Sequence, residues 1–186
     1  MSNPHLEGGT KKSWIDLGYS LFSEEGHEGL QVERLARILK KNKSGYYHYF
    51  GDRFVYMDEL LKEHLRILEN ILFEIQQIRE FEPEYMQLMM RYKQTVLFQM
   101  QLVKNREVKD FFETAQKFNL AVKQSVAPVF ANYLNVPVEE APKYWEVLRD
   151  SFYSRVTFKT FSPEWIGAFA RELKDLLENA SHRQVG

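Results

Sequence analysis

The stretch LARILKKNKSGYYHYFGDR, residues 35–53, decides how the rest of this 186-residue chain is interpreted. It begins inside an apolar stripe with the spacing i, i+3, i+4, i+7 of one helix face, made by Val32, Leu35, Ala36 and Leu39. A lysine-rich turn follows, and Asn42 is a good N-cap for a second short helix. Asp52 can cap another helix directly after it. The stretch therefore predicts two short helices joined by a tight turn, with a third helix starting at once.

The second short helix has two different faces. Tyr46 and Phe50 are four residues apart, so they point the same way and are expected to face inward. The opposite face carries Lys43, Tyr47 and His48, which would make a poor core. Because a helix of this length is not stable alone, its neighbours must hold it in place. This pattern is typical of a helix-turn-helix whose last helix enters a DNA groove.

Positive charge is concentrated in the same stretch. The whole chain has a formal net charge of −1 and a pI near 6.5, so it has no general attraction for nucleic acid. Residues 34–53, however, include six cationic side chains and a single acidic one, Asp52. The six cations are Arg34, Arg37, Lys40, Lys41, Lys43 and Arg53. A local basic patch suits phosphate binding, although charges alone would also fit a solvated face.

Residues from about Thr10 to Tyr56 resemble the DNA-binding domain of the TetR family of bacterial transcriptional regulators. The positions that carry the resemblance are Leu21-Phe22, Gly26, Leu35-Ala36, Lys40-Lys41-Asn42, Tyr47-His48-Tyr49-Phe50 and Arg53. The resemblance implies an all-α fold with two domains. Residues 1–55 would be a tail and a three-helix DNA-binding domain, and residues 56–186 a helical domain for ligand binding and dimerisation.

The resemblance also implies which residues contact DNA: Lys43, Ser44, Gly45, Tyr47, His48, Tyr49 and Arg53. Lys43, Ser44 and Gly45 would approach base edges, where Lys43 can donate to guanine acceptors. Tyr47, Tyr49 and Arg53 would hold phosphates, which fixes register but not sequence. For each tyrosine, packing between helices is the competing role.

The turn departs from the family pattern, because Lys40-Lys41 stands where a Gly-Val pair is usual. Lys40 replaces a glycine, which adopts the left-handed region without strain, and Lys41 replaces a buried valine. Gln31 is also a weak cap for the helix before the turn. The two lysines either add phosphate contacts or spoil the turn. The second outcome gives an alternative function: a helical ligand-binding or protein-interaction module that has lost specific DNA binding.

The rest of the chain is expected to be helical throughout. Thr10 can cap the first helix, preceded by a polar tail of residues 1–9. A long helix should run from Asp52 to about residue 78, and a further one should begin at Pro83. Pro128 is expected to kink or divide a later helix, and Ser162-Pro163 to start the last one.

Methionine and aromatic side chains enrich the expected second domain. Such residues line adaptable apolar pockets, but they also fill ordinary cores. By resemblance this domain binds a small apolar or aromatic ligand, and the candidate lining is Met86, Met90, Phe98, Phe111, Phe112 and Phe118.

The last two expected helices, residues 144–158 and 165–177, carry more apolar surface than one stripe per helix needs. By resemblance they form a four-helix bundle with a second copy of the chain. The candidate interface residues are Trp145, Phe152, Val156, Trp165, Phe169 and Leu173. A two-fold dimer presents its recognition helices about one DNA turn apart, so a palindromic operator is expected.

Other classes of protein have little support. The chain has no cysteine, no apolar run near the roughly 20 residues that span a bilayer, and no apolar signal-peptide core, so a cytoplasmic protein is expected. The histidines lack helical metal-site spacing, and phosphate-loop and nucleophile motifs are missing. We therefore expect no enzyme, metal or cofactor. The predicted function is a regulator, with repression expected, that binds a palindromic operator and is released by an apolar ligand.

Overall fold

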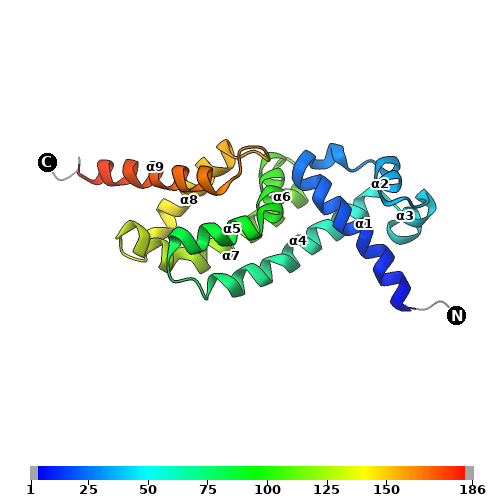
Figure 1. Cartoon of the computed structure of the whole chain (residues 1–186), viewed down its shortest axis with the longest axis horizontal. Coiled ribbons are helices and arrows are strands. Elements are labelled where there is room, and N and C mark those ends of the chain that lie inside the picture. Colours follow the sequence, from blue (N-terminus) through cyan, green and yellow to red (C-terminus); the bar gives the residue numbers. More distant parts are fainter. Residues whose placement is uncertain (1–3, 183–186) are drawn as a thin grey trace. The chain divides into compact units, whose positions relative to one another are not determined.

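The computed structural model describes residues 4–182, with side chains described for residues 11–176 (Figure 1). Within that range the chain forms helices joined by short connections and no strand, which confirms the all-α fold class. None of the helices described is long and apolar enough to cross a membrane.

Two compact units are formed, and they do not follow the expected boundary at residues 55 and 56. The first unit comprises Met1–Leu68 and Gln94–Ala115, and the second comprises Glu69–Lys93 and Gln116–Gly186. The early part of the long fourth helix and a later segment therefore pack with the N-terminal helices. The functional division at residue 55 remains a prediction.

The N-terminal elements match the expected order. They are α1 (Pro4–Glu25), the 3-10 turn η1 (Gly26–Gly29), α2 (Val32–Leu39) and α3 (Lys43–Phe50). Gly26 ends α1 with φ of +72°, in the region that glycine adopts without strain. The expected start of α1 at Thr10 was wrong. The helix begins at Pro4, a residue that suits a first helical turn, and continues through the two glycines before Thr10; residues 1–3 of the expected tail lie outside the described range.

Side-chain caps define the starts of α3 and of the helix that follows it, as predicted. Asn42 Oδ1 accepts from the Ser44 backbone N–H at 3.3 Å and caps α3. Asp52 Oδ1 accepts from the N–H groups of Phe54 and Val55, at 2.8 and 3.0 Å, and caps α4 (Arg53–Ile75). These caps satisfy donors that a helix start leaves unpaired. Gln31 makes no side-chain cap at α2.

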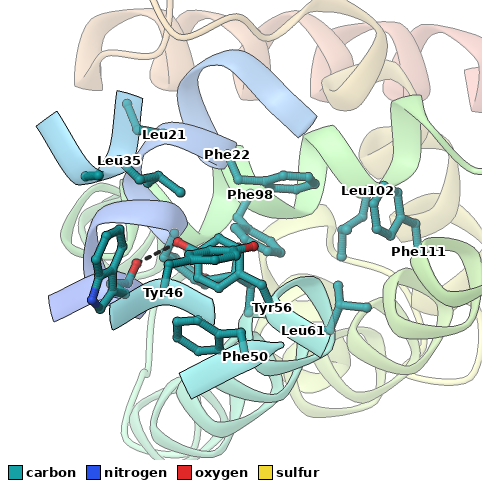
Figure 2. Close-up of a cluster of buried hydrophobic side chains, with 14 of the residues drawn as sticks. Leu21, Phe22, Leu35, Tyr46, Phe50, Tyr56, Leu61, Phe98, Leu102 and Phe111 are labelled. Atoms are coloured by element: carbon teal, nitrogen blue, oxygen red, sulfur yellow. Dashed lines mark hydrogen bonds between the residues drawn. The ribbon is translucent and has the colours of Figure 1, made fainter. Parts of the chain in front are cut away.

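The core of the first unit is aromatic (Figure 2). Tyr46, Phe50 and Tyr56 lie together, with ring centroids 4.7 to 5.2 Å apart. The Tyr56 hydroxyl donates to the Trp14 carbonyl oxygen at 2.6 Å, and Figure 2 draws this hydrogen bond as a dashed line. Gly18 makes this approach possible, because a Cβ there would lie 1.8 Å from the Tyr56 hydroxyl oxygen. The close packing of α4 on α1 thus requires a glycine at position 18.

The remaining elements correct one expectation and show that Pro128 does not divide a helix. They are the short turn η2 (Phe81–Tyr85), α5 (Met86–Arg91), α6 (Lys93–Lys104), α7 (Lys109–Leu134), α8 (Ala141–Arg155) and α9 (Pro163–His182). The helix expected from Pro83 is divided at Tyr92, whose hydroxyl donates to Glu74 at 2.6 Å. Pro128 lies inside a continuous α7 and does not divide it. Ser162 caps α9 as predicted, since its Oγ accepts from the Trp165 N–H at 3.2 Å.

Candidate nucleic-acid interface

The turn between α2 and α3 is well formed although a lysine occupies its critical position. Lys40 is in the left-handed region, with φ of 53° and ψ of 42°. Its N–H donates to the Arg37 carbonyl at 3.2 Å, and the Lys41 N–H donates to the Ala36 carbonyl at 2.9 Å. These bonds cap the carbonyl end of α2 in the way that glycine-ended helices do. The two lysines therefore do not spoil the turn.

The charged group of Lys41 has a polar partner although this position is usually buried in the family pattern. Its side chain is half-buried, and its Nζ donates to Ser13 Oγ at 2.5 Å. The aliphatic stem packs while the ammonium group reaches a polar partner on α1.

The candidate recognition helix α3 has the two faces that its sequence predicts. Tyr46 and Phe50 are buried in the aromatic core. The DNA-contacting candidates lie on the other side: Lys43, Ser44, Tyr47 and His48 are exposed, Gly45 and Tyr49 are half-buried, and Arg53 is exposed at the start of α4. A Cβ at Gly45 would meet nothing within 4 Å, so the backbone there is open to a close approach. The first unit thus holds these seven residues on or next to one short helix.

Two of the basic residues are already in ion pairs, which the sequence analysis missed. Lys43 Nζ lies 2.9 Å from Glu33 Oε1 on α2, and Arg34 forms a two-bonded pair with Glu25. The hydrogen bond from Lys43 lowers the pKa of Glu33 and raises that of Lys43. Both carboxylates lie just before the basic stretch in sequence, and only the folded chain brings them onto it. Among the described residues Arg37, Lys40 and Arg53 have no such partner, so positive charge remains around α3.

Comparison with known proteins tests the fold directly. No protein-family model matches the sequence, and no curated protein is significantly similar to it. A transcriptional regulator of the TetR/AcrR family from Aquifex aeolicus VF5, solved by crystallography, has a similar structure. The TM-score is 0.60 over 92% of this chain and 99% of that chain, at 14% sequence identity. This chain has the TetR/AcrR fold.

Within the TetR/AcrR fold, the six ligand-lining candidates are divided between the two units. Phe98 is fully buried in the first unit, stacked on Tyr19 and close to Phe22. Phe111 is also core there, and Phe112 is 43% exposed. Met86, Met90 and Phe118 belong to the second unit, where Met86 and Phe118 are buried and Met90 is half-buried. Phe98 therefore packs in the interior, because aromatics at helical spacing pack first against neighbouring helices. Phe111 is buried, and it also lines a cleft of about 320 Å³ in the first unit.

The dimer candidates of the TetR/AcrR fold also divide into two groups. Trp145, Phe152, Val156 and Phe169 are buried within the single chain. Phe152, for example, lies 5.8 Å from Phe169 and 5.6 Å from Trp165, measured between ring centroids. These four are core positions of the single chain, and their place in a dimer interface stays a prediction. Trp165 and Leu173 are half-buried, and exposed apolar side chains occur at Leu176 and at Val147, of which Val147 was not expected from the sequence.

A chain of buried hydrogen bonds crosses the first unit. His64 of α4, fully buried, lies 2.7 Å from the Tyr19 hydroxyl through Nδ1 and 2.9 Å from Gln99 Oε1 through Nε2. The Gln99 amide nitrogen donates to the Ala115 carbonyl at 2.9 Å, which leaves its oxygen to accept from His64. Nε2 of His64 therefore carries a proton. Burial lowers its pKa to about 4.

Proposed function

We propose that this chain is a transcriptional regulator that binds a palindromic operator as a homodimer. It acts as a repressor in the cytoplasm and leaves the operator when a small, mainly apolar ligand binds. The fold supports a regulator of this kind, since the similar structure from Aquifex aeolicus is described as one. The proposal for DNA rests on residues of this chain.

The observation that carries the proposal is the presentation of α3. Tyr46 and Phe50 hold the helix from behind, while Lys43 and His48 are exposed and the side chain of Tyr47 is 52% exposed. An exposed helix face of this composition is poor packing surface for a protein core. It suits a major groove, where Lys43 donates to guanine and tyrosine hydroxyls reach phosphates.

The dimer is proposed to form through α8 and α9. Val147 is 58% exposed and Leu176 is 56% exposed, and Trp165 and Leu173 add half-buried apolar surface on α9. Exposed apolar side chains on neighbouring helices are what a subunit interface requires. A two-fold axis between the copies would repeat α3 at a fixed spacing on DNA.

Release by a ligand would follow from a shift between two arrangements of the dimer. The long helix α4 begins with Arg53 beside α3 and continues to Ile75, past the boundary of the first unit. A ligand that favours a spacing of the two α3 helices that misfits the operator would lower DNA affinity. Met86, Met90 and Phe118 remain the candidates for its contacts.

Selection of bound duplexes from a randomised pool tests the proposal. The full chain should enrich sites with two inverted half-sites whose centres lie about 34–36 Å, or one helical turn, apart, or a multiple of this. Enrichment of single unpaired sites would overturn the dimeric arrangement. Recovery of the pool without any preference would overturn specific DNA binding.

The alternative of a module without DNA binding was motivated by Lys40-Lys41. Since the turn closes with its usual hydrogen bonds, that motive no longer applies. The alternative still predicts that changes on the outer face of α3 leave function unaffected.

A further inference from the structure

An open cleft of about 500 Å³ lies beside the candidate recognition helix in the first unit. It is lined by Gly45 and by six side chains from α1, the turn and α3: Trp14, Lys41, Asn42, Ser44, His48 and Tyr49. Trp14 comes from α1 and Lys41 from the turn, and the sequence leaves the role of Lys41 open. The cleft brings these two residues next to candidates for DNA contact.

The chemistry of the lining favours an anion. Lys41 supplies a full positive charge, and Ser44, His48 and Tyr49 supply groups that can donate hydrogen bonds. None of the lining residues is Asp or Glu. A second cleft of the same unit, of about 320 Å³, differs in this respect, because Asp58 and Asp110 line it beside His27 and Arg53. The cleft beside α3 is therefore the one suited to negative charge.

Trp14 provides an independent indication of a ligand. Its side chain is fully buried, and its Nε1–H has no acceptor among the described residues. Buried donors are almost always paired, because an unpaired one destabilises the fold. The Trp14 ring itself packs edge-on against the Tyr46 ring, with 5.7 Å between the ring centroids. The nitrogen itself is covered, so an acceptor in the cleft that Trp14 lines would satisfy this donor once the lining side chains move to admit it.

We infer that this cleft binds one phosphate of the DNA backbone, held by Lys41, Ser44 and His48 and bonded by the Trp14 indole N–H. The inference rests on the proposed function. A phosphate contact would explain why a lysine occupies a position that is usually apolar. One N–H of the Lys41 ammonium group donates to the Ser13 hydroxyl, and the other two can donate to phosphate oxygens. Such a contact fixes the register of α3 and does not read sequence.

The salt dependence of operator binding measures this contact. Each neutralised phosphate contributes about 0.9 to the slope of log affinity against log salt. Lys41→Met should reduce the steepness by about 0.9 and weaken binding roughly eightfold at 0.1 M salt, while leaving the preference for operator over other DNA unchanged. Lys41→Arg keeps the charge and should keep the slope. Lys159→Met is the matched control, an exposed lysine lost from the second unit, and should change nothing.

Thermal unfolding of each variant shows whether it folds, and Lys41→Arg keeps the test valid if Lys41→Met is unstable. A slope that is unchanged in folded Lys41→Met, or reduced in Lys41→Arg, overturns the inference. If the wild-type protein shows no salt-dependent operator binding, the proposed function itself fails. These two failures are therefore distinguishable.

The indole N–H signals in an NMR spectrum test the part of Trp14. The chain has three tryptophans, and the other two, Trp145 and Trp165, act as references in the second unit. Operator DNA should shift the Trp14 signal and slow its exchange with water. A Trp14 signal that stays in place overturns its contact. Inorganic phosphate should have no effect at concentrations where DNA saturates; an equal shift would mark a site for free anions and overturn the inference.

Discussion

At the scale of single residues, the carboxylate of Glu33 reduces the positive charge of the outer face of α3. It pairs with Lys43 at 2.9 Å and carries a negative charge beside the proposed groove-facing residues. Glu33→Gln should therefore strengthen binding to any DNA sequence a few-fold at low salt, and the gain should shrink as salt rises.

Fluorescence anisotropy with operator and unrelated duplexes measures this change. Glu172→Gln is the matched control, because Glu172 pairs with Arg155 in the second unit. Weaker binding by Glu33→Gln would contradict the account and would show that the carboxylate itself contacts DNA.

His64 makes the stability of the first unit depend on pH. Its pKa is lowered to about 4 in the folded chain, against about 6.5 when unfolded. The unfolded chain therefore binds a proton first as pH falls, and the stabilising contribution is complete above pH 6.5 and is lost between pH 6.5 and 4. The expected loss of unfolding free energy from pH 7 to 4.5 is about 2–3 kcal/mol.

Urea unfolding at the two pH values tests this expectation. His64→Gln should lose this part of the pH dependence, whatever its stability at pH 7. His27→Gln, at an exposed histidine, should keep it. An equal pH dependence in wild type and His64→Gln would contradict the buried neutral state of His64.

At the scale of elements, Gly18 decides how closely α4 packs on α1. Alanine normally stabilises a helix by about 1 kcal/mol relative to glycine. Here a Cβ would lie 1.8 Å from the Tyr56 hydroxyl oxygen, so Gly18→Ala should instead destabilise the protein by about 1–3 kcal/mol. Tyr56→Phe removes the obstructing oxygen, although it also removes the hydrogen bond to Trp14. The double variant should therefore be more stable than the sum of the two single changes implies, and strict additivity in urea unfolding would contradict this packing.

Local rules predicted the helix starts and ends that depend on one or two residues. Asn42, Asp52 and Ser162 cap the helices that were expected, and Gly26 ends α1. The division at Tyr92 was missed, because no proline or glycine marks it in the sequence.

The candidate interface was only partly predictable for the same physical reason. Spacing alone indicates that Tyr46 faces inward and Lys43 outward, since both follow from the helical period. Spacing cannot show that Glu33 reaches Lys43 from another helix, or that Lys41 shares a cleft with Trp14.

The sequence also could not show which apolar side chains of α8 and α9 are buried against the neighbouring helix. Phe152 and Phe169 look like surplus apolar surface when each helix is considered alone. They are core because α8 and α9 pack on each other.

At the scale of the whole molecule, the proposed regulator consists of two copies of the chain. Leu176→Lys should weaken the dimer, because the variant places a charge on the exposed apolar surface of α9. Analytical ultracentrifugation should then show more monomer, and affinity for a full palindrome should fall toward that for a half-site. Phe73→Lys alters another exposed apolar residue outside α8 and α9 and should change neither measurement. A dimer that survives Leu176→Lys unchanged would contradict the proposed interface.

The central claim is that the outer face of α3 binds operator DNA, and one measurement tests it most directly. Anisotropy titrations of a selected palindromic duplex compare wild type with the double variant Lys43→Ala/Tyr47→Ala, which leaves the buried Tyr46 and Phe50 in place. The account predicts that the wild-type protein binds with an affinity that falls steeply as salt rises, and that the folded double variant binds at least about tenfold more weakly. Equal affinity of the two proteins for the palindrome would contradict it.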